Sequence, residues 1–223
     1  MKKYLLEIVV FICGADLMIL EMVGSRVLAP YLGTSIYVWT SLIGVILGCL
    51  SLGYWTGGKL ADKQANPRTL SSIIFLSAIS ITLVSFFKEY LITHIQNIII
   101  NDPRVITTVA ALILFGPPST LLGIVSPYAA KLRINSLSSS GSTVGTLYAI
   151  STIGSIVGTF LAGFFLIAFL GNTRILIVLA ISLAGASFLL YSKDKALKII
   201  SLLIFIVYLG ISTQTNRMSA ILS

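Results

Sequence analysis

Long apolar runs follow one another along almost the whole chain, and they constrain its fold more than any other feature. A helix needs about 20 apolar residues to cross a hydrocarbon core about 30 Å thick. The chain is 57% hydrophobic and only 10% charged, whereas soluble domains carry about 25% charged residues. The sequence therefore predicts an all-α polytopic membrane protein. Its seven expected spans cover residues 4–29, 36–59, 69–87, 105–131, 144–170, 173–191 and 196–213.

The basic residues lie in short clusters between these runs, and one side of the expected topology holds most of them. That side contains Lys2, Lys3, Lys59, Lys63, Arg68, Lys131, Arg133, Lys193, Lys195 and Lys198. The other side contains Lys88, Arg104, Arg174 and Arg217. Connections rich in Lys and Arg stay in the cytoplasm. The pattern predicts a cell-membrane protein with a cytoplasmic N-terminus, and it argues against nucleic acid as the reason for the net charge of +8.

A pattern of small residues recurs in the second and fifth runs. SLIGVILGCLSLG begins at Ser41 and STIGSIVGTFLAG begins at Ser151. The aligned glycines are Gly44 with Gly154, Gly48 with Gly158, and Gly53 with Gly163. The match predicts close helix packing at Gly44, Gly48, Gly154 and Gly158 and an inverted repeat of three plus three helices, which is half of a major-facilitator-like bundle. The alternative is chance, because small residues are common wherever membrane helices pack.

This repeat sets the expected domain organisation. Residues 1–191 form a six-helix membrane domain, and residues 192–223 form a seventh helix and a short tail. Between the third and fourth runs, residues 88–103 are expected to form a short helix lying at the membrane surface, because their apolar residues can share one side of a helix.

The first run carries ionisable residues at positions where the bilayer makes them costly. Asp16, Glu21 and Arg26 interrupt ICGADLMILEMVGSRVLAP, and a charge at bilayer depth costs about 2.5–3.5 kcal/mol on insertion scales. One basic residue cannot neutralise two acids. Two interpretations stay open: structural ion pairing with another helix or subunit, or a substrate or ion site inside the bundle made by these three residues.

Two further motifs suggest moving or irregular parts. Residues 57–63, GGKLADK, resemble the loop between helices two and three of major facilitator proteins, and we expect Gly58, Asp62 and Lys63 to act as a gating loop. The alternative is an ordinary cytoplasmic connection. In the fourth run, FGPPSTLLGIVSPYAAKLR predicts a helix break beside a cavity, because prolines remove backbone donors. The prolines are Pro117, Pro118 and Pro127. A purely structural kink is the alternative.

Four segments together resemble one family. They are EMVGSRVLAPYLGTSIYVW, IGVILGCLSLGYWTGGKLAD, FGPPSTLLGIVSPYAAKLR and LYAISTIGSIVGTFLAGFFLI. In order and spacing they resemble the membrane half of fused major-facilitator/spermidine-synthase proteins, over about residues 10–190. In that family the membrane half precedes a soluble aminopropyltransferase-like domain. This chain contains no glycine-rich nucleoside loop and no aqueous acidic loop, so the synthase activity is not expected here.

These patterns predict a membrane protein without enzyme activity, catalytic residues, cofactor or metal. The expected role is transport or channelling of a small, possibly polyamine-like, cation, in association with a spermidine-synthase-like system. A homodimer or a membrane partner would have to complete a cavity that six helices half enclose. The alternative is a membrane anchor or scaffold, without transport, for a soluble synthase-like enzyme.

Overall fold

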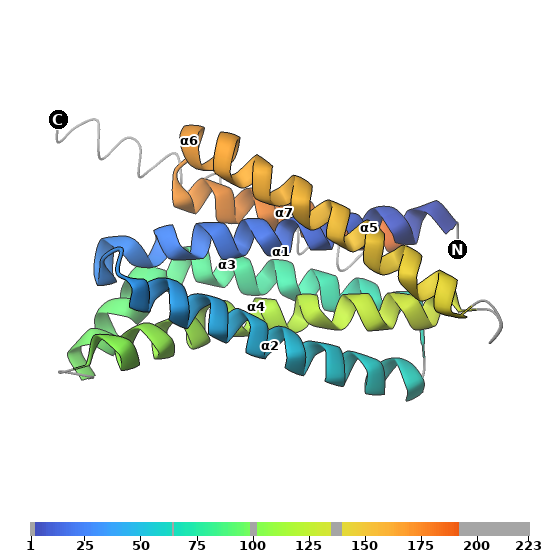
Figure 1. Ribbon diagram of the computed structural model, residues 1–223, viewed down its shortest axis with the longest axis horizontal. Coiled ribbons are helices and arrows are strands. Elements are labelled where there is room, and N and C mark those ends of the chain that lie inside the picture. The colour runs from blue at the N-terminus through green and yellow to red at the C-terminus, as the bar shows by residue number, and fades with distance from the viewer. Residues whose placement is uncertain (1–2, 64, 99–101, 135–139, 192–223) are drawn as a thin grey trace. The chain divides into compact units, whose positions relative to one another are not determined.

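The computed structural model describes residues 3–63, 65–98, 102–134 and 140–191. These residues form a bundle of six long helices with no strand among them (Figure 1). The all-α prediction is therefore confirmed. The long helices are α1 (Lys3–Leu32), α2 (Ile36–Lys63), α3 (Pro67–Ile98), α4 (Pro103–Arg133), α5 (Ser140–Leu161) and α7 (Asn172–Leu190). A π-helical segment, η2 (Ala162–Leu166), and the short α6 (Ile167–Phe169) continue α5 to Phe169.

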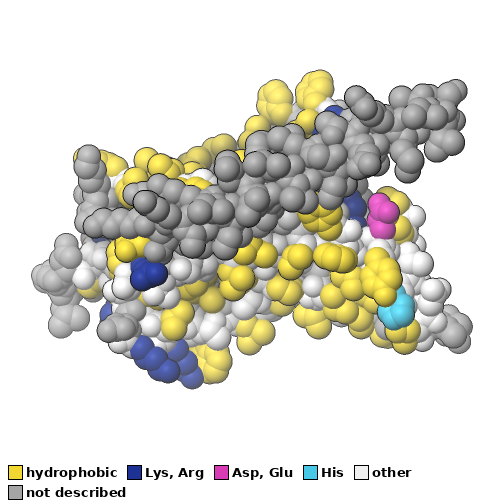
Figure 2. All heavy atoms as spheres, turned by 180° about the vertical axis from the view of Figure 1, so that it is seen from behind, with side chains coloured by type: hydrophobic (Ala, Val, Ile, Leu, Met, Phe, Trp, Pro, Cys, Tyr) yellow, Lys and Arg dark blue, Asp and Glu magenta, His cyan; other side chains and the backbone are white. Residues whose placement is uncertain are grey.

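Five stretches of helix are long and apolar enough to cross a membrane. They are Ile36–Lys63, Pro67–Ile98, Pro103–Arg133, Ser140–Phe169 and Asn172–Leu190. The helix α1 is 30 residues long and lies alongside them. Apolar side chains are spread over the visible face, the largest basic groups lie towards one end, and an acidic group and the histidine lie towards the other, with a further basic group beside the acidic one (Figure 2). This distribution suits a bundle that crosses a hydrocarbon layer.

The helices pack in two equivalent sets. α2 packs along α4 as α5 packs along α1, and α3 packs on α4 as α7 packs on α1. Exchanging the first three helices for the last three therefore preserves the contacts. The helices α1 and α4 run in opposite directions (Figure 1). This is the pattern that an inverted repeat produces.

Glycine makes the closest contacts in both sets. In α5, a side chain at Gly154 or Gly158 would overlap the α1 backbone at Phe11 or Ala15. In α2, a Cβ atom at Gly57 would lie 2.8 Å from the Cα atom of Ile124 in α4. Small residues let helix backbones approach in this way.

The predicted packing glycines are right in α5 and wrong in α2. Nothing lies within 4 Å of a Cβ atom built at Gly44 or Gly48. Gly53 and Gly57, each nine residues further on, contact α4 instead. Nine residues are two and a half helical turns, so these glycines lie on opposite sides of α2. The glycines that pack in α2 are therefore nine residues away from those that the sequence match aligns with Gly154 and Gly158.

The expected helix break in α4 is also wrong. The helix runs without interruption from Pro103 to Arg133, although Pro117, Pro118 and Pro127 lie inside it. Proline fixes φ near a helical value, and the Thr120 hydroxyl donates a 2.9 Å hydrogen bond to the Gly116 carbonyl beside the proline pair. Pro117 and Pro118 border an apolar cavity of about 360 Å³ between α3 and α4.

The third helix extends further than the hydropathy pattern predicts. Residues 88–98 belong to α3 rather than to a separate surface helix. The buried ammonium of Lys88 donates a 2.6 Å hydrogen bond to the Thr173 hydroxyl, and the Gln96 amide donates a 2.8 Å bond to the Tyr31 carbonyl. These contacts hold the polar end of α3 on the bundle. The predicted seventh helix, within residues 192–223, lies outside the described residues.

Candidate functional site

Asp16 is buried in the bundle and lines neither of the two cavities described below. The residue is 4% exposed, and its carboxyl group is hydrogen-bonded to the Ser182 hydroxyl of α7. Its Oδ2 atom has no hydrogen-bond partner among the described residues. Asp16 therefore joins α1 to α7 on the side of α1 that α7 covers.

Two cavities lie along another side of α1. The first, which we call the hydroxyl cavity, has a volume of about 130 Å³ and lies among α1, α2, α4 and α5. No charged residue lines it, and its polar groups are mostly hydroxyls. Its lining residues are Cys13, Gly14, Leu17, Leu50, Tyr54, Leu122, Val125, Ser126, Tyr148, Ser151, Thr152 and Ser155.

Helix geometry explains which hydroxyls the hydroxyl cavity keeps available. The Ser155 hydroxyl donates to the Gly14 and Ser151 carbonyls, both at 3.1 Å, and Thr152 donates to the Tyr148 carbonyl. These groups still have lone pairs to offer as acceptors. Tyr54 and Tyr148 add phenol groups from α2 and α5. The hydroxyl cavity can therefore accept hydrogen bonds from a donor-rich ligand.

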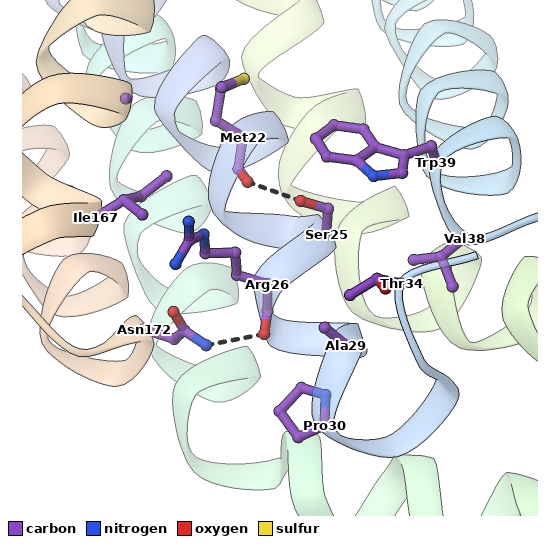
Figure 3. Close-up of a pocket in the computed structure, with 11 residues that line it drawn as sticks. Met22, Ser25, Arg26, Ala29, Pro30, Thr34, Val38, Trp39, Ile167 and Asn172 are labelled. Atoms are coloured by element: carbon purple, nitrogen blue, oxygen red, sulfur yellow. Dashed lines mark hydrogen bonds between the residues drawn. The ribbon is translucent and has the colours of Figure 1, made fainter. Parts of the chain in front are cut away.

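The second cavity, which we call the arginine cavity, has a volume of about 560 Å³ and lies towards the C-terminal end of α1. In Figure 3, α1 lies between α6 and the start of α7 on one side and the start of α2 on the other. The Arg26 side chain extends towards Ile167 and Asn172, and Trp39 lies across from it. Its lining residues are Met22, Ser25, Arg26, Ala29, Pro30, Thr34, Val38, Trp39, Gly163, Ile167 and Asn172.

Glu21 lies between the two cavities on α1. Leu17 lines the hydroxyl cavity and Ser25 lines the arginine cavity. Glu21 is four residues from each, about one turn, so the three residues share one side of the helix. Glu21 is half-buried. Among the described residues, its carboxylate makes no ion pair.

The structure thus gives the three ionisable residues of the first run three different surroundings. Asp16 is bonded to α7, Glu21 lies between two cavities, and Arg26 lines the larger one. They do not form one cluster. Among the described residues, neither Glu21 nor Arg26 has an ion-pair partner, so the expected structural pairing of these residues is not seen there.

The motif at residues 57–63 forms the end of a helix rather than a loop. Asp62 lies in the last turn of α2, which ends at Lys63. The Lys131 ammonium of α4 lies 2.7 Å from the Asp62 carboxylate, and both side chains are exposed. Gly58 has open space around it. At the same end of the bundle, Arg133 of α4 pairs with Glu7 of α1 at 3.3 Å.

Sequence reasoning missed most of the polar cavity lining. Tyr54, Tyr148, Trp39 and Asn172 carried no recognisable motif. The spacing of Ser151 and Ser155 was a usable signal, because residues four apart share one side of a helix. Both serines lie inside the aligned repeat, but the interpretation of that repeat used only its glycines.

The long helices, their apolar surface and the two cavities with polar lining define a multi-pass integral membrane protein. No protein-family model matches the chain, and no curated protein or solved structure is detectably similar to it. Within the described ranges, no three His, Cys, Asp or Glu side chains are grouped so that they could hold a metal ion.

Proposed function

We propose that the chain is a transport or channelling subunit for a small organic cation of the polyamine type. The observation that carries this proposal is the hydroxyl cavity inside an otherwise apolar bundle, with Glu21 one turn further along α1 from Leu17 of its lining. Buried polar groups in a membrane protein are costly, and they commonly mark a ligand path.

The lining of the hydroxyl cavity, together with Glu21, suits a ligand in which ammonium groups are joined by methylene chains. Hydroxyl oxygens accept hydrogen bonds from ammonium groups, and the Tyr54 and Tyr148 rings can contact both cations and methylenes. Glu21 supplies one negative charge. The hydroxyl cavity has none of its own, so a cation would be bound without being trapped. Asp16 takes a structural role in this scheme.

The basic end of the bundle and the two cavities suggest how the protein is oriented in the membrane and which partners it contacts. The positive-inside rule supports a cytoplasmic position for the N-terminus and for the ends of α2 and α4. In this proposal a second copy, or a membrane partner, packs beside the hydroxyl cavity and completes the route of the ligand. The resemblance to the membrane half of major-facilitator/spermidine-synthase proteins supports the choice of ligand, and it supports a separate synthase-like enzyme as a soluble partner.

A membrane anchor for such an enzyme is the second candidate function. The observation that favours it is the basic end of the bundle, where Lys59, Lys63, Lys131 and Arg133 meet at the ends of α2 and α4. An acidic soluble protein could dock there without any ligand path being used.

Calorimetric titration of spermidine into the protein in nanodiscs of zwitterionic lipid tests the proposal. We expect saturable binding at moderate salt, weakened at least tenfold by Glu21→Gln. Asp16→Asn is the matched control, because it replaces a carboxyl group on the same helix that lines neither cavity. It should alter stability and keep the affinity. If a folded wild-type sample does not bind, or if Glu21→Gln binds equally well, the transport proposal fails and the anchor remains.

A further inference from the structure

The arginine cavity has a charge opposite to the one that a polyamine path requires. Arg26 is exposed, and its guanidinium lies in a cavity whose lining contains no Asp or Glu. Among the described residues, it makes no ion pair. We propose that this cavity binds the phosphate group of a ligand. This assignment goes beyond the proposed function and rests on different residues.

The donors around the arginine cavity support an oxyanion rather than a neutral group. A guanidinium presents two parallel N–H groups that match two oxygens of a phosphate. Thr34 and Trp39 add a hydroxyl and an indole N–H to the lining of the same cavity, on the other side of α1 from the guanidinium (Figure 3). The Asn172 amide is already engaged, donating a 2.8 Å bond to the Arg26 carbonyl. Asn172 therefore fixes the backbone from which the guanidinium extends.

The size and depth of the arginine cavity suit a ligand that is more than a bare ion. A volume of about 560 Å³ is within the usual range of about 300–1,000 Å³ for small-molecule sites. Met22, Val38 and Ile167 give it apolar surface beside the charged group. Arg26 lies near the end of α1 and Trp39 in the first turn of α2, and the ends of membrane helices lie at headgroup depth.

An arginine near a helix end can also extend to the interface without any site. The cavity separates the two cases, because an arginine that only extends to the interface needs no hollow of this size beside it, lined by further hydrogen-bond donors. The phosphate could belong to a lipid headgroup or to a soluble phosphate ester. Both share the chemistry that Arg26 recognises, and the experiment distinguishes them.

Tryptophan fluorescence can report on this cavity alone. The chain has two tryptophans, and Trp55 lies elsewhere on α2 with the Lys59 ammonium 3.7 Å from its ring centroid. Trp55→Phe leaves Trp39 as the only reporter. We would titrate this variant, in a neutral maltoside detergent, with dihexanoyl-phosphatidylglycerol below its micelle concentration. We expect a saturable change in Trp39 emission, with an affinity at least tenfold weaker in Arg26→Gln.

Arg104→Gln is the matched control, because its guanidinium lies 5.0 Å from the Tyr37 ring, outside the arginine cavity. That variant should keep the affinity, and Arg26→Lys should keep part of it and check that the fold tolerates change at this position. Displacement of the lipid by inorganic phosphate at constant ionic strength indicates a soluble phosphate ligand. Failure of phosphate to displace it indicates a lipid headgroup.

Three results would overturn the proposal. They are no saturable response in folded protein, equal affinity in Arg26→Gln, and the same response to dihexanoylglycerol, which lacks the phosphate. Spermidine titrations of the same samples keep the two proposals separate, because Arg26→Gln should leave spermidine binding intact.

Discussion

The position of each charged residue on α1 decides its role. Asp16, Glu21 and Arg26 lie on one helix within three turns, yet Asp16 is bonded to a neighbouring helix, Glu21 lies between two cavities and Arg26 lines one of them. Hydropathy could show that these residues are unusual. It could not show that Ser182 lies opposite Asp16, because a serine in an apolar run has no feature that marks its partner. The sequence therefore singled out these three residues but could not separate their surroundings.

Close glycine packing gives a prediction at the same scale. At Gly154, a methyl group would overlap the Phe11 carbonyl of α1, which is backbone and cannot rotate away. We expect Gly154→Ala to lower the free energy of unfolding by about 1–3 kcal/mol, the usual cost of overpacking. Titration with sodium dodecyl sulfate, followed by circular dichroism, measures the change.

Gly44→Ala is the control for this substitution. Gly44 occupies the aligned position in α2 but faces open space. Alanine there removes the helix penalty of glycine, about 0.5–1 kcal/mol, so stability should stay equal or rise. If Gly44→Ala and Gly154→Ala change the free energy of unfolding equally, the difference in packing described for these two glycines is wrong.

Pairs of helices are the units of this bundle. Close contacts join α2 to α4 and α1 to α5, while α3 and α7 meet through a polar contact in the interior. There the Ser71 and Ser187 hydroxyls lie 2.9 Å apart, and the Ser187 hydroxyl lies 2.8 Å from the Ser71 carbonyl. Hydroxyls that bridge membrane helices take the place of water that the bilayer cannot supply.

Removing one of these hydroxyls tests the contact between α3 and α7. We expect Ser187→Ala to cost about 0.6–1.7 kcal/mol, the range measured for such bonds in membranes. Adding Ser71→Ala should cost less than Ser71→Ala does alone, because the two hydroxyls share a contact, but some cost should remain, because the Ser71 hydroxyl also donates a 2.9 Å bond to the Ser187 carbonyl. Unfolding titrations of the two single variants and the double variant give the coupling. Ser72→Ala, whose hydroxyl bonds only within α3, should change little, and additive effects at 71 and 187 would argue against a shared contact.

Element boundaries were predictable wherever hydropathy alone decides them. The second predicted span, 36–59, and the helix Ile36–Lys63 share their first residue. The prediction failed in α4, where a local bond from the Thr120 hydroxyl to the Gly116 carbonyl supports the turn beside the proline pair. It also failed at the polar end of α3, which tertiary hydrogen bonds from Lys88 and Gln96 hold on the bundle. The partners of Lys88 and Gln96 are distant in sequence and carry no pattern that marks them.

At the scale of the whole molecule, the even alternation of helices places the connections at two ends. Ser35 lies between α1 and α2 at one end, and Ala65 lies between α2 and α3 at the other. Both are exposed. With basic residues held in the cytoplasm, we expect a membrane-impermeant maleimide to label Ser35→Cys on intact cells and to label Ala65→Cys only after permeabilisation.

The two native cysteines can be removed before this experiment. Cys13 and Cys49 are buried, and replacing them by alanine gives a background without thiols. The cysteine-free protein, without an added cysteine, should not be labelled in intact or in permeabilised cells. Labelling of Ala65→Cys in intact cells, with Ser35→Cys protected, would reverse the topology that the charge pattern predicts.

The hydrogen bond between Asp16 and Ser182 has a consequence for how the chain is made. α1 leaves the ribosome first, and α5 and α7, its partners, leave last among the described helices. Synthesis proceeds at about 5–20 residues per second, so Asp16 spends of the order of ten seconds or more without the helix that bonds it. During that interval α1 can contact α2 and α4, which are made earlier, but not α5 or α7. Its retention must depend on the insertion machinery or on membrane chaperones, and a truncated product that ends before α7 should be a preferred substrate of membrane proteases.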